Sequence, residues 1–260
     1  MARSAARGRR LAVVYDIEPP HVRLGILWFV VVLVAMGVGV GAVAVVYGIT
    51  AALAAYQAAR CWRIRKPNRP DPVVAAAIAG AMSLAAAVSV GAIGVAILCG
   101  VLAAVFRAFT ETKAPFLATA GRTLQCGLWP GGAAAGMVSA YRFELWAAVA
   151  LVLAVSAYET GDYLVGSGSR NKYEGPIAGV VATMVVLFAV AAVGLPPFEL
   201  DNAVQFGVLA AVLCPAGQVL ASVVLPAAAA PAPAMRRLDS LLLLAPIWAV
   251  TAGAVAASAA

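Results

Sequence analysis

The run LGILWFVVVLVAMGVGVGAVAVVYGITAALAAYQAA at 24–59 decides the fold class of this chain. It holds 36 residues without one charged side chain. Because a helix rises about 1.5 Å per residue, one helix of that length would span roughly 54 Å, well beyond the ~30 Å hydrocarbon core of a bilayer. We therefore predict two membrane helices that meet in a tight hairpin near Gly39–Gly41.

The composition extends this interpretation to the whole chain. Of the 260 residues, 64% are hydrophobic and only 11% are charged, whereas about a quarter of the residues of a soluble domain are charged. A second long run, Val73–Phe106, is expected to split near Gly91. Single apolar segments follow at Cys126–Ala140, Leu145–Tyr158, Ile177–Leu195, Ala203–Leu225 and Leu241–Ala257. The sequence thus predicts an all-α polytopic integral membrane protein with about nine transmembrane helices.

One segment leaves the helix number open. The stretch LWPGG at 128–132 is typical of a re-entrant or kinked segment, which would reduce the nine crossings to seven. Glycines four residues apart, at Gly37/Gly41 and Gly132/Gly136, have the spacing that lets membrane helices approach closely. The four cysteines are scattered and the single histidine lies in the N-terminal tail, so no zinc site is expected.

The basic residues predict the orientation. With a cytoplasmic N-terminus and nine crossings, 17 of the 18 Lys and Arg residues fall in cytoplasmic segments, and only Arg142 falls outside. Such an excess is typical of the cytoplasmic side, so we expect a multi-pass protein of the cell inner (plasma) membrane. The cytoplasmic segments would be 1–23, 60–72, 107–125, 159–176 and 226–240. The expected organisation is a basic cytoplasmic tail (1–23), an N-terminal transmembrane region (24–156) and a C-terminal transmembrane region (157–260).

Two polar islands interrupt the apolar sequence, at 159–176 (ETGDYLVGSGSRNKYEGP) and at 236–240 (RRLDS). Both fall on the predicted cytoplasmic side. Ionisable groups beside hydrocarbon are costly and mark candidate functional sites, although ordinary loops also carry charges that anchor helix ends. If the helix before the first island continues, Glu159 and Asp162 lie three residues apart on one face.

The islands contain the groups that phosphoryl and nucleotidyl transfer require. Carboxylates can hold Mg²⁺, and cations can neutralise phosphate. The candidate Mg²⁺ ligands are Asp239, Glu159, Asp162 and Glu174. The backbone at Ser167 and Gly168 can present N–H groups to an anion, and Arg170, Lys172, Arg236 and Arg237 supply positive charge. No Walker-type phosphate loop is present in the sequence.

Three short motifs occur in this sequence in the same order as in a known enzyme family. Glu159–Tyr163 (ETGDY) resembles the D-[ST]-G-A-Y stretch of the phosphatidate cytidylyltransferase (CDP-diacylglycerol synthase) family. Arg170–Gly175 (RNKYEG) looks like its K-K-T-x-E-G segment, and Arg236–Leu241 (RRLDSL) resembles the D-R-x-D-S signature before its last helix. The resemblance covers about residues 157–250.

This resemblance implies a nucleotidyltransferase of phospholipid biosynthesis that uses Mg²⁺. Such an enzyme joins CTP to phosphatidic acid, or to a related lipid phosphate, and releases CDP-lipid and pyrophosphate. It implies catalytic roles for Asp239, Lys172 and Arg237, and substrate-binding roles for Arg170, Ser167, Gly168, Arg236 and Gln218. The expected partners are an anionic lipid, CTP and the membrane, with a homodimer allowed and no nucleic acid.

Several positions depart from the family pattern. Gln218 stands where the G-D-L-x-E-S segment has Asp, and Ala221 stands where it has Glu. The Ala- and Pro-rich stretch Pro226–Ala234 replaces a lysine-containing segment. These departures leave a second hypothesis open, a catalytically inactive family member that acts as a lipid-binding or membrane scaffold protein. A third hypothesis, a small-solute transporter, is based on Pro215 and Gly217, which would interrupt a helix beside Gln218.

Overall fold

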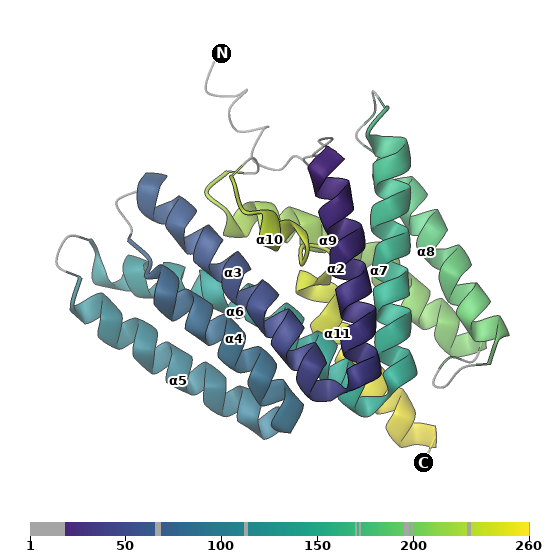
Figure 1. The fold of residues 1–260 in the computed structure, drawn as a ribbon, viewed down its shortest axis with the longest axis horizontal. Helices are drawn as coiled ribbons and strands as arrows, with labels where there is room; N and C mark the ends of the chain where they lie inside the picture. Colours follow the sequence, from purple (N-terminus) through teal and green to yellow (C-terminus); the bar gives the residue numbers. More distant parts are fainter. Residues whose placement is uncertain are drawn as a thin grey trace.

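The computed structural model describes residues 19–65, 69–111, 114–169, 171, 173–194, 198, 200–227 and 230–259. Over these residues the chain forms helices and no strand, so the all-α prediction is confirmed (Figure 1). The described helices are α2 (Pro19–Val38), α3 (Val40–Arg65), α4 (Pro72–Val88), α5 (Val90–Phe109), α6 (Phe116–Phe143), α7 (Leu145–Gly166), α8 (Glu174–Ala192), α9 (Leu200–Val224), the short α10 (Pro233–Arg236) and α11 (Leu241–Ala259).

Both predicted hairpins are present. Gly39 separates α2 from α3 with a φ of +133°, a conformation that residues with a Cβ rarely adopt. Ser89 separates α4 from α5, and its Oγ accepts a hydrogen bond of 3.0 Å from the N–H of Ala92. This second break lies two residues before the predicted Gly91. Each long apolar run therefore folds back on itself at a small residue.

The side chain of Asp71 caps the start of α4. One oxygen of Asp71 accepts hydrogen bonds from the N–H groups of Val73 and Val74, at 2.9 and 3.0 Å. Its other oxygen accepts a 2.7 Å bond from Nε of Arg107, near the end of α5. The Asp71 side chain therefore satisfies the first turn of α4 and joins it to α5.

Two helices are longer than predicted. α6 begins ten residues before the expected Cys126 and runs through Pro130 as one helix, so a re-entrant loop there is wrong. α7 continues eight residues past the expected end at Tyr158. α9 likewise runs through Pro215 without a break. An internal proline costs a helix about 3 kcal/mol, and the burial of Pro130 shows that packing against neighbouring helices offsets this cost.

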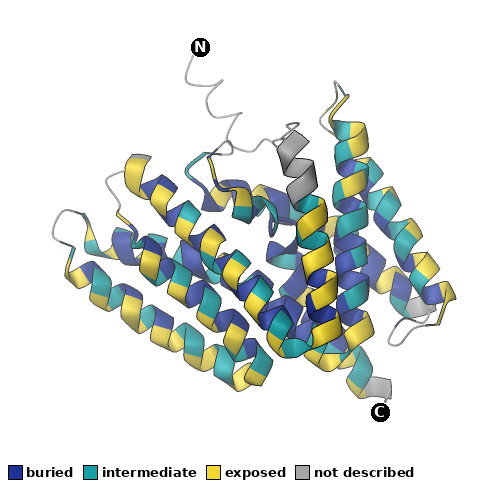
Figure 2. Cartoon of the chain, viewed as in Figure 1, coloured by how far each residue is buried: buried dark blue, intermediate teal, exposed yellow. Residues whose placement is uncertain are grey.

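Five of the described helices are long and apolar enough to cross a membrane, and they lie in α3, α5, α7, α8 and α9. Three shorter apolar helices are found at Gly25–Val38, Pro72–Val88 and Leu241–Ala257. Large hydrophobic side chains such as Leu98, Leu102 and Phe106 are exposed on the outer faces, which Figure 2 shows in yellow. A surface of this kind is suited to lipid and not to water.

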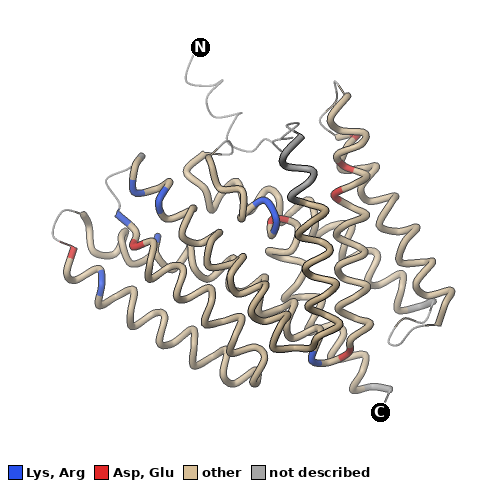
Figure 3. Tube along the Cα trace, in the orientation of Figure 1, with Lys and Arg blue, Asp and Glu red and all other residues tan. Residues whose placement is uncertain are grey.

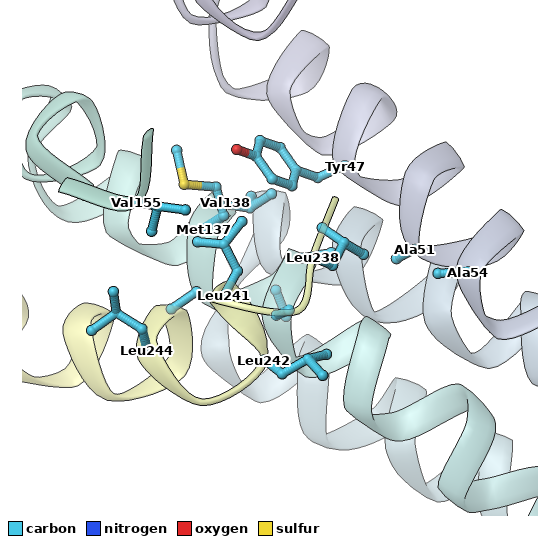
Figure 4. Close-up of a cluster of buried hydrophobic side chains, with 14 of the residues drawn as sticks. Tyr47, Ala51, Ala54, Met137, Val138, Val155, Leu238, Leu241, Leu242 and Leu244 are labelled. Carbon is cyan, nitrogen blue, oxygen red and sulfur yellow. The ribbon is translucent and has the colours of Figure 1, made fainter. Parts of the chain in front are cut away.

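The core is built from small residues and a few large ones. A Cβ added at Gly136 of α6 would lie 2.5 Å from the backbone of α11 at Ala245 and Pro246, so only glycine fits there. By contrast, Gly37, Gly41 and Gly132 have no atoms within 4 Å of such a Cβ. Larger side chains meet above this contact, where α3, α6, α7 and α11 come together (Figure 4).

Candidate functional site

A group of polar side chains, here called the polar cluster, lies where α7, α9 and the turn before α11 meet. Its members are Tyr158, Glu159, Asp162, Gln218, Arg236, Arg237, Asp239 and Ser240. Figure 3 shows basic and acidic positions side by side between α10 and α11, and further acidic positions along the upper half of α7. Segments from both predicted islands therefore contribute to one site.

α7 positions the first part of the cluster. Because the helix continues to Gly166, the expected helical continuation through Glu159 and Asp162 is confirmed, and Tyr158 and Asp162 are one turn apart. α8 packs closely against this turn, since a Cβ at Gly179 would lie 2.7 Å from the carbonyl oxygen of Tyr158. A Cβ at Gly161 would lie 2.8 Å from the carbonyl oxygen of Ala178. These two glycines let α8 support the polar face of α7.

Gln218 of α9 links two side chains of α7. Its Nε2 donates a 3.3 Å hydrogen bond to Oδ2 of Asp162, and its Oε1 accepts a 3.4 Å bond from the hydroxyl of Tyr158. All three side chains are buried. A buried carboxylate needs such partners, because an unpaired charge in an apolar interior is very costly. The amide at position 218 therefore acts as a hydrogen-bonding bridge.

The turn before α11 supplies the second part. Oδ2 of Asp239 lies 3.7 Å from Nη1 of Arg236, and Oδ1 accepts a 2.8 Å bond from the N–H of Ser240. Burial raises the pKa of Asp239 to about 6, while Arg236 and the bonds from Ser240 oppose this rise. The carboxyl group of Asp239 therefore titrates close to physiological pH.

Glu159 connects the two parts. Its carboxylate lies close enough to Asp239, Arg237, Asp162 and the side chain of Ser240 for electrostatic interaction. The guanidinium group of Arg237 lies against α2, since a Cβ at Gly25 would come within 2.8 Å of its Nη1. Two arginines and three carboxylates thus share one partly buried region of the helical bundle.

The structure does not unite all the predicted site residues. Glu174 is exposed at the start of α8, where its carboxylate accepts a 2.5 Å bond from Oγ of Ser169. Ser167 and Gly168 are exposed in the turn after α7. Arg170 and Lys172 lie outside the described residues. Of the first island, the polar cluster therefore takes only residues of α7.

The predicted Mg²⁺ ligands do not form one binding set. Among the residues that the structure describes, no three His, Cys, Asp or Glu side chains are grouped so that they could hold a metal ion. Glu174 takes part in its own turn, Asp162 is bonded to Gln218, and Asp239 is paired with Arg236. Because hard cations need several free oxygen ligands, this donor set does not fit Mg²⁺.

Sequence reasoning missed Tyr158, Ser240 and Tyr47 as site residues. Tyr158 and Ser240 are immediate neighbours of the predicted Glu159 and Asp239, and their roles depend on contacts between helices. Tyr47 comes from the middle of the first apolar run and lies close enough to Glu159 for an electrostatic interaction. The sequence offered no specific signal for it, because Thr50, Tyr56 and Gln57 are also polar residues of that run.

The fold and the site define the class of the protein. Its described residues form helices and no strands, several of these helices are suited to a membrane, and the bundle holds a partly buried polar cluster of acids and arginines. No family model, curated protein or solved structure matches this chain.

Proposed function

We propose that this membrane protein binds the phosphate group of a lipid at the polar cluster and transfers a cytidylyl group from CTP to it. The convergence of Glu159, Asp162 and Asp239 with two arginines is the observation that supports the proposal. These residues come from segments whose order resembles that of the phosphatidate cytidylyltransferases. The proposed product is a CDP-lipid, and the second product is pyrophosphate.

The proposed placement in the membrane follows from the charges. We propose nine crossings of the inner membrane, a cytoplasmic N-terminus, and a polar cluster that opens to the cytoplasm, where CTP is found. The closeness of Glu159 of α7 to Asp239 in the turn after α10 supports this arrangement, because it brings residues of the two islands to one place in the bundle. Arg142, the one basic residue expected outside, lies at the far end of α6.

The chemistry that we propose needs little proton transfer. A lipid phosphate is already anionic, so its oxygen can attack the α-phosphorus of CTP directly. A new P–O bond forms to that phosphorus, and the bond from it to the pyrophosphate leaving group breaks. Arg236 and Arg237 would compensate the charge of the phosphate groups. Positioning and charge compensation dominate reactions of this type.

The experiment is a measurement of pyrophosphate release by the purified full-length protein in vesicles that contain phosphatidic acid, with CTP and Mg²⁺. Asp239→Asn should abolish release, because it removes a carboxylate of the polar cluster. Glu174→Gln is the matched control and should keep wild-type activity, because Glu174 lies in a separate turn. Release that survives Asp239→Asn, or that is lost equally in both variants, would contradict the proposed site.

A second candidate function is lipid binding without turnover. It is favoured by the bridge at Gln218 and by the ion pair between Arg236 and Asp239, which leave no grouped metal ligands among the described residues. This candidate predicts that phosphatidic acid binds to the protein in nanodiscs while no pyrophosphate is formed. Turnover of CTP would exclude it, and the absence of both binding and turnover would overturn both functions.

A further inference from the structure

The side chain of Tyr47 has an unsatisfied buried hydroxyl group. Tyr47 is only 1% exposed, and its hydroxyl has no hydrogen-bond partner among the described residues. Most buried polar groups in folded proteins are paired, because an unpaired hydroxyl in an apolar interior is costly. An exception of this kind needs an explanation, and a missing ligand is one that can be tested.

The surroundings of Tyr47 hold its ring in a defined direction. The indole of Trp28 packs on the ring edge to face, with 5.5 Å between the ring centroids. Figure 4 shows the Tyr47 hydroxyl on the side of the ring that faces Val155 of α7, above Met137. Val155 and Glu159 are four residues apart in α7 and therefore share a face. The phenol is thus aimed towards the α7 side of the polar cluster.

Tyr47 lies near the edge of this cluster, and so does α2, which carries the Trp28 that packs on it. Its phenol interacts electrostatically with Glu159. In addition, Arg237 of the cluster reaches α2 at Gly25, one helical turn from the Trp28 that packs on Tyr47. α2 and α3 therefore border the region that α7, α9 and the α11 turn enclose. A group bound between them would be close to a hydroxyl donor and a guanidinium donor.

We propose that the hydroxyl of Tyr47 donates a hydrogen bond to a phosphate oxygen of the lipid bound at the polar cluster. This inference rests on the proposed function, because it assigns a further residue to the same site. Tyr47 is a binding residue contributed by the N-terminal half of the chain, outside the segments that carry the family resemblance. It would make the first apolar hairpin part of the lipid site.

The experiment compares Tyr47→Phe with wild-type protein in nanodiscs of phosphatidylcholine that contain a titrated fraction of phosphatidic acid. Tyr47→Phe keeps the ring and its packing and removes only the hydroxyl. We expect the affinity for phosphatidic acid to fall about 10- to 100-fold, as for the loss of one hydrogen bond to a charged group. The melting temperature of the lipid-free protein should not fall, since the hydroxyl has no partner to lose.

The matched control is Thr119→Val. Thr119 has the other buried hydroxyl without a partner among the described residues, and it lies in the first turn of α6. This variant should bind phosphatidic acid as the wild type does. A parallel titration with soluble glycerol phosphate tests whether the phosphate alone is recognised or whether the lipid is required.

The outcomes distinguish failure of the proposed lipid binding from failure of the role assigned to Tyr47. If the wild type binds no phosphatidic acid, the proposed function fails and the role of Tyr47 fails with it. If the wild type binds and Tyr47→Phe binds equally well, only the role of Tyr47 is overturned. A marked loss of melting temperature in lipid-free Tyr47→Phe would also overturn it, because the hydroxyl would then have a structural partner.

Discussion

The contact between α9 and the turn before α11 depends on the absence of a side chain at Gly217. A Cβ at this position would overlap the carbonyl oxygen of Asp239 and would lie 3.3 Å from that of Ser240. Both are backbone atoms, which cannot rotate away as a side chain can. We predict that Gly217→Ala moves the turn away from α9 and with it the carboxylate of Asp239.

The magnitude can be worked out against a control in the same helix. Overpacking costs about 1–3 kcal/mol, and replacing a helical glycine with alanine returns up to about 1 kcal/mol. A Cβ at Gly207 would lie 2.6 Å from Sδ of Met184, which belongs to a flexible side chain that can move. Gly207→Ala therefore keeps most of the stability that alanine adds to a helix in place of glycine. We expect Gly217→Ala to be about 2 kcal/mol less stable than Gly207→Ala.

The assay is thermal unfolding of the purified proteins together with their binding of phosphatidic acid. A difference of about 2 kcal/mol corresponds to a melting temperature about 4–8 °C lower for Gly217→Ala. Its lipid binding should also weaken, whereas Gly207→Ala should bind as the wild type does. Equal melting temperatures and equal binding would show that α9 does not support the turn, and the reasoning about the site would be wrong.

Three further predictions test single contacts. Tyr158→Phe removes the donor to Gln218 and should cost about 1 kcal/mol of unfolding free energy; an unchanged melting curve would contradict this bond. Asp239 has a pKa of about 6, so lowering the pH from 7 to 5 neutralises its carboxylate and should strengthen binding of phosphatidic acid. The Asp239→Asn variant should lose that part of the pH dependence of binding. Identical pH profiles of binding for the variant and the wild type would exclude the effect. Trp62→Phe leaves the carbonyl of Val224 without its 2.7 Å bond and should cost about 1–3 kcal/mol, measured by thermal unfolding.

Much of the fold could be predicted because it follows from local properties. Helix number and hairpin positions depend on the length of apolar runs and on a small residue at each reversal, and Gly39 satisfies both conditions. The course of α6 could not be predicted in this way. Pro130 would interrupt an isolated helix, and it is tolerated here because the residues around it are buried against other helices. Such contacts between distant segments have no local signal.

In the candidate site, too, the local features could be predicted and the contacts between distant segments could not. The three-residue spacing of Glu159 and Asp162 predicted a shared helical face, and α7 provides it. Glu174 belongs to the same polar island, but it lies at the start of α8, after the chain has turned, and its carboxylate accepts a hydrogen bond from Ser169. Tyr47 enters the site from more than a hundred residues away along the chain. Its role depends on how α3 and α7 each pack against α6, which no motif encodes.

The amide at position 218 changes the charge that the polar cluster must balance. With every carboxyl group ionised, three carboxylates and two arginines would leave one net negative charge, and an aspartate in place of Gln218 would leave two. Buried charge of one sign needs an opposite charge nearby, so a site with that aspartate would need a metal ion more strongly. In the proposed site, which has Gln218, Arg236 would leave Asp239 to pair with the lipid phosphate, and Asp239 would take up a proton. A pKa of about 6 keeps that proton within reach at physiological pH.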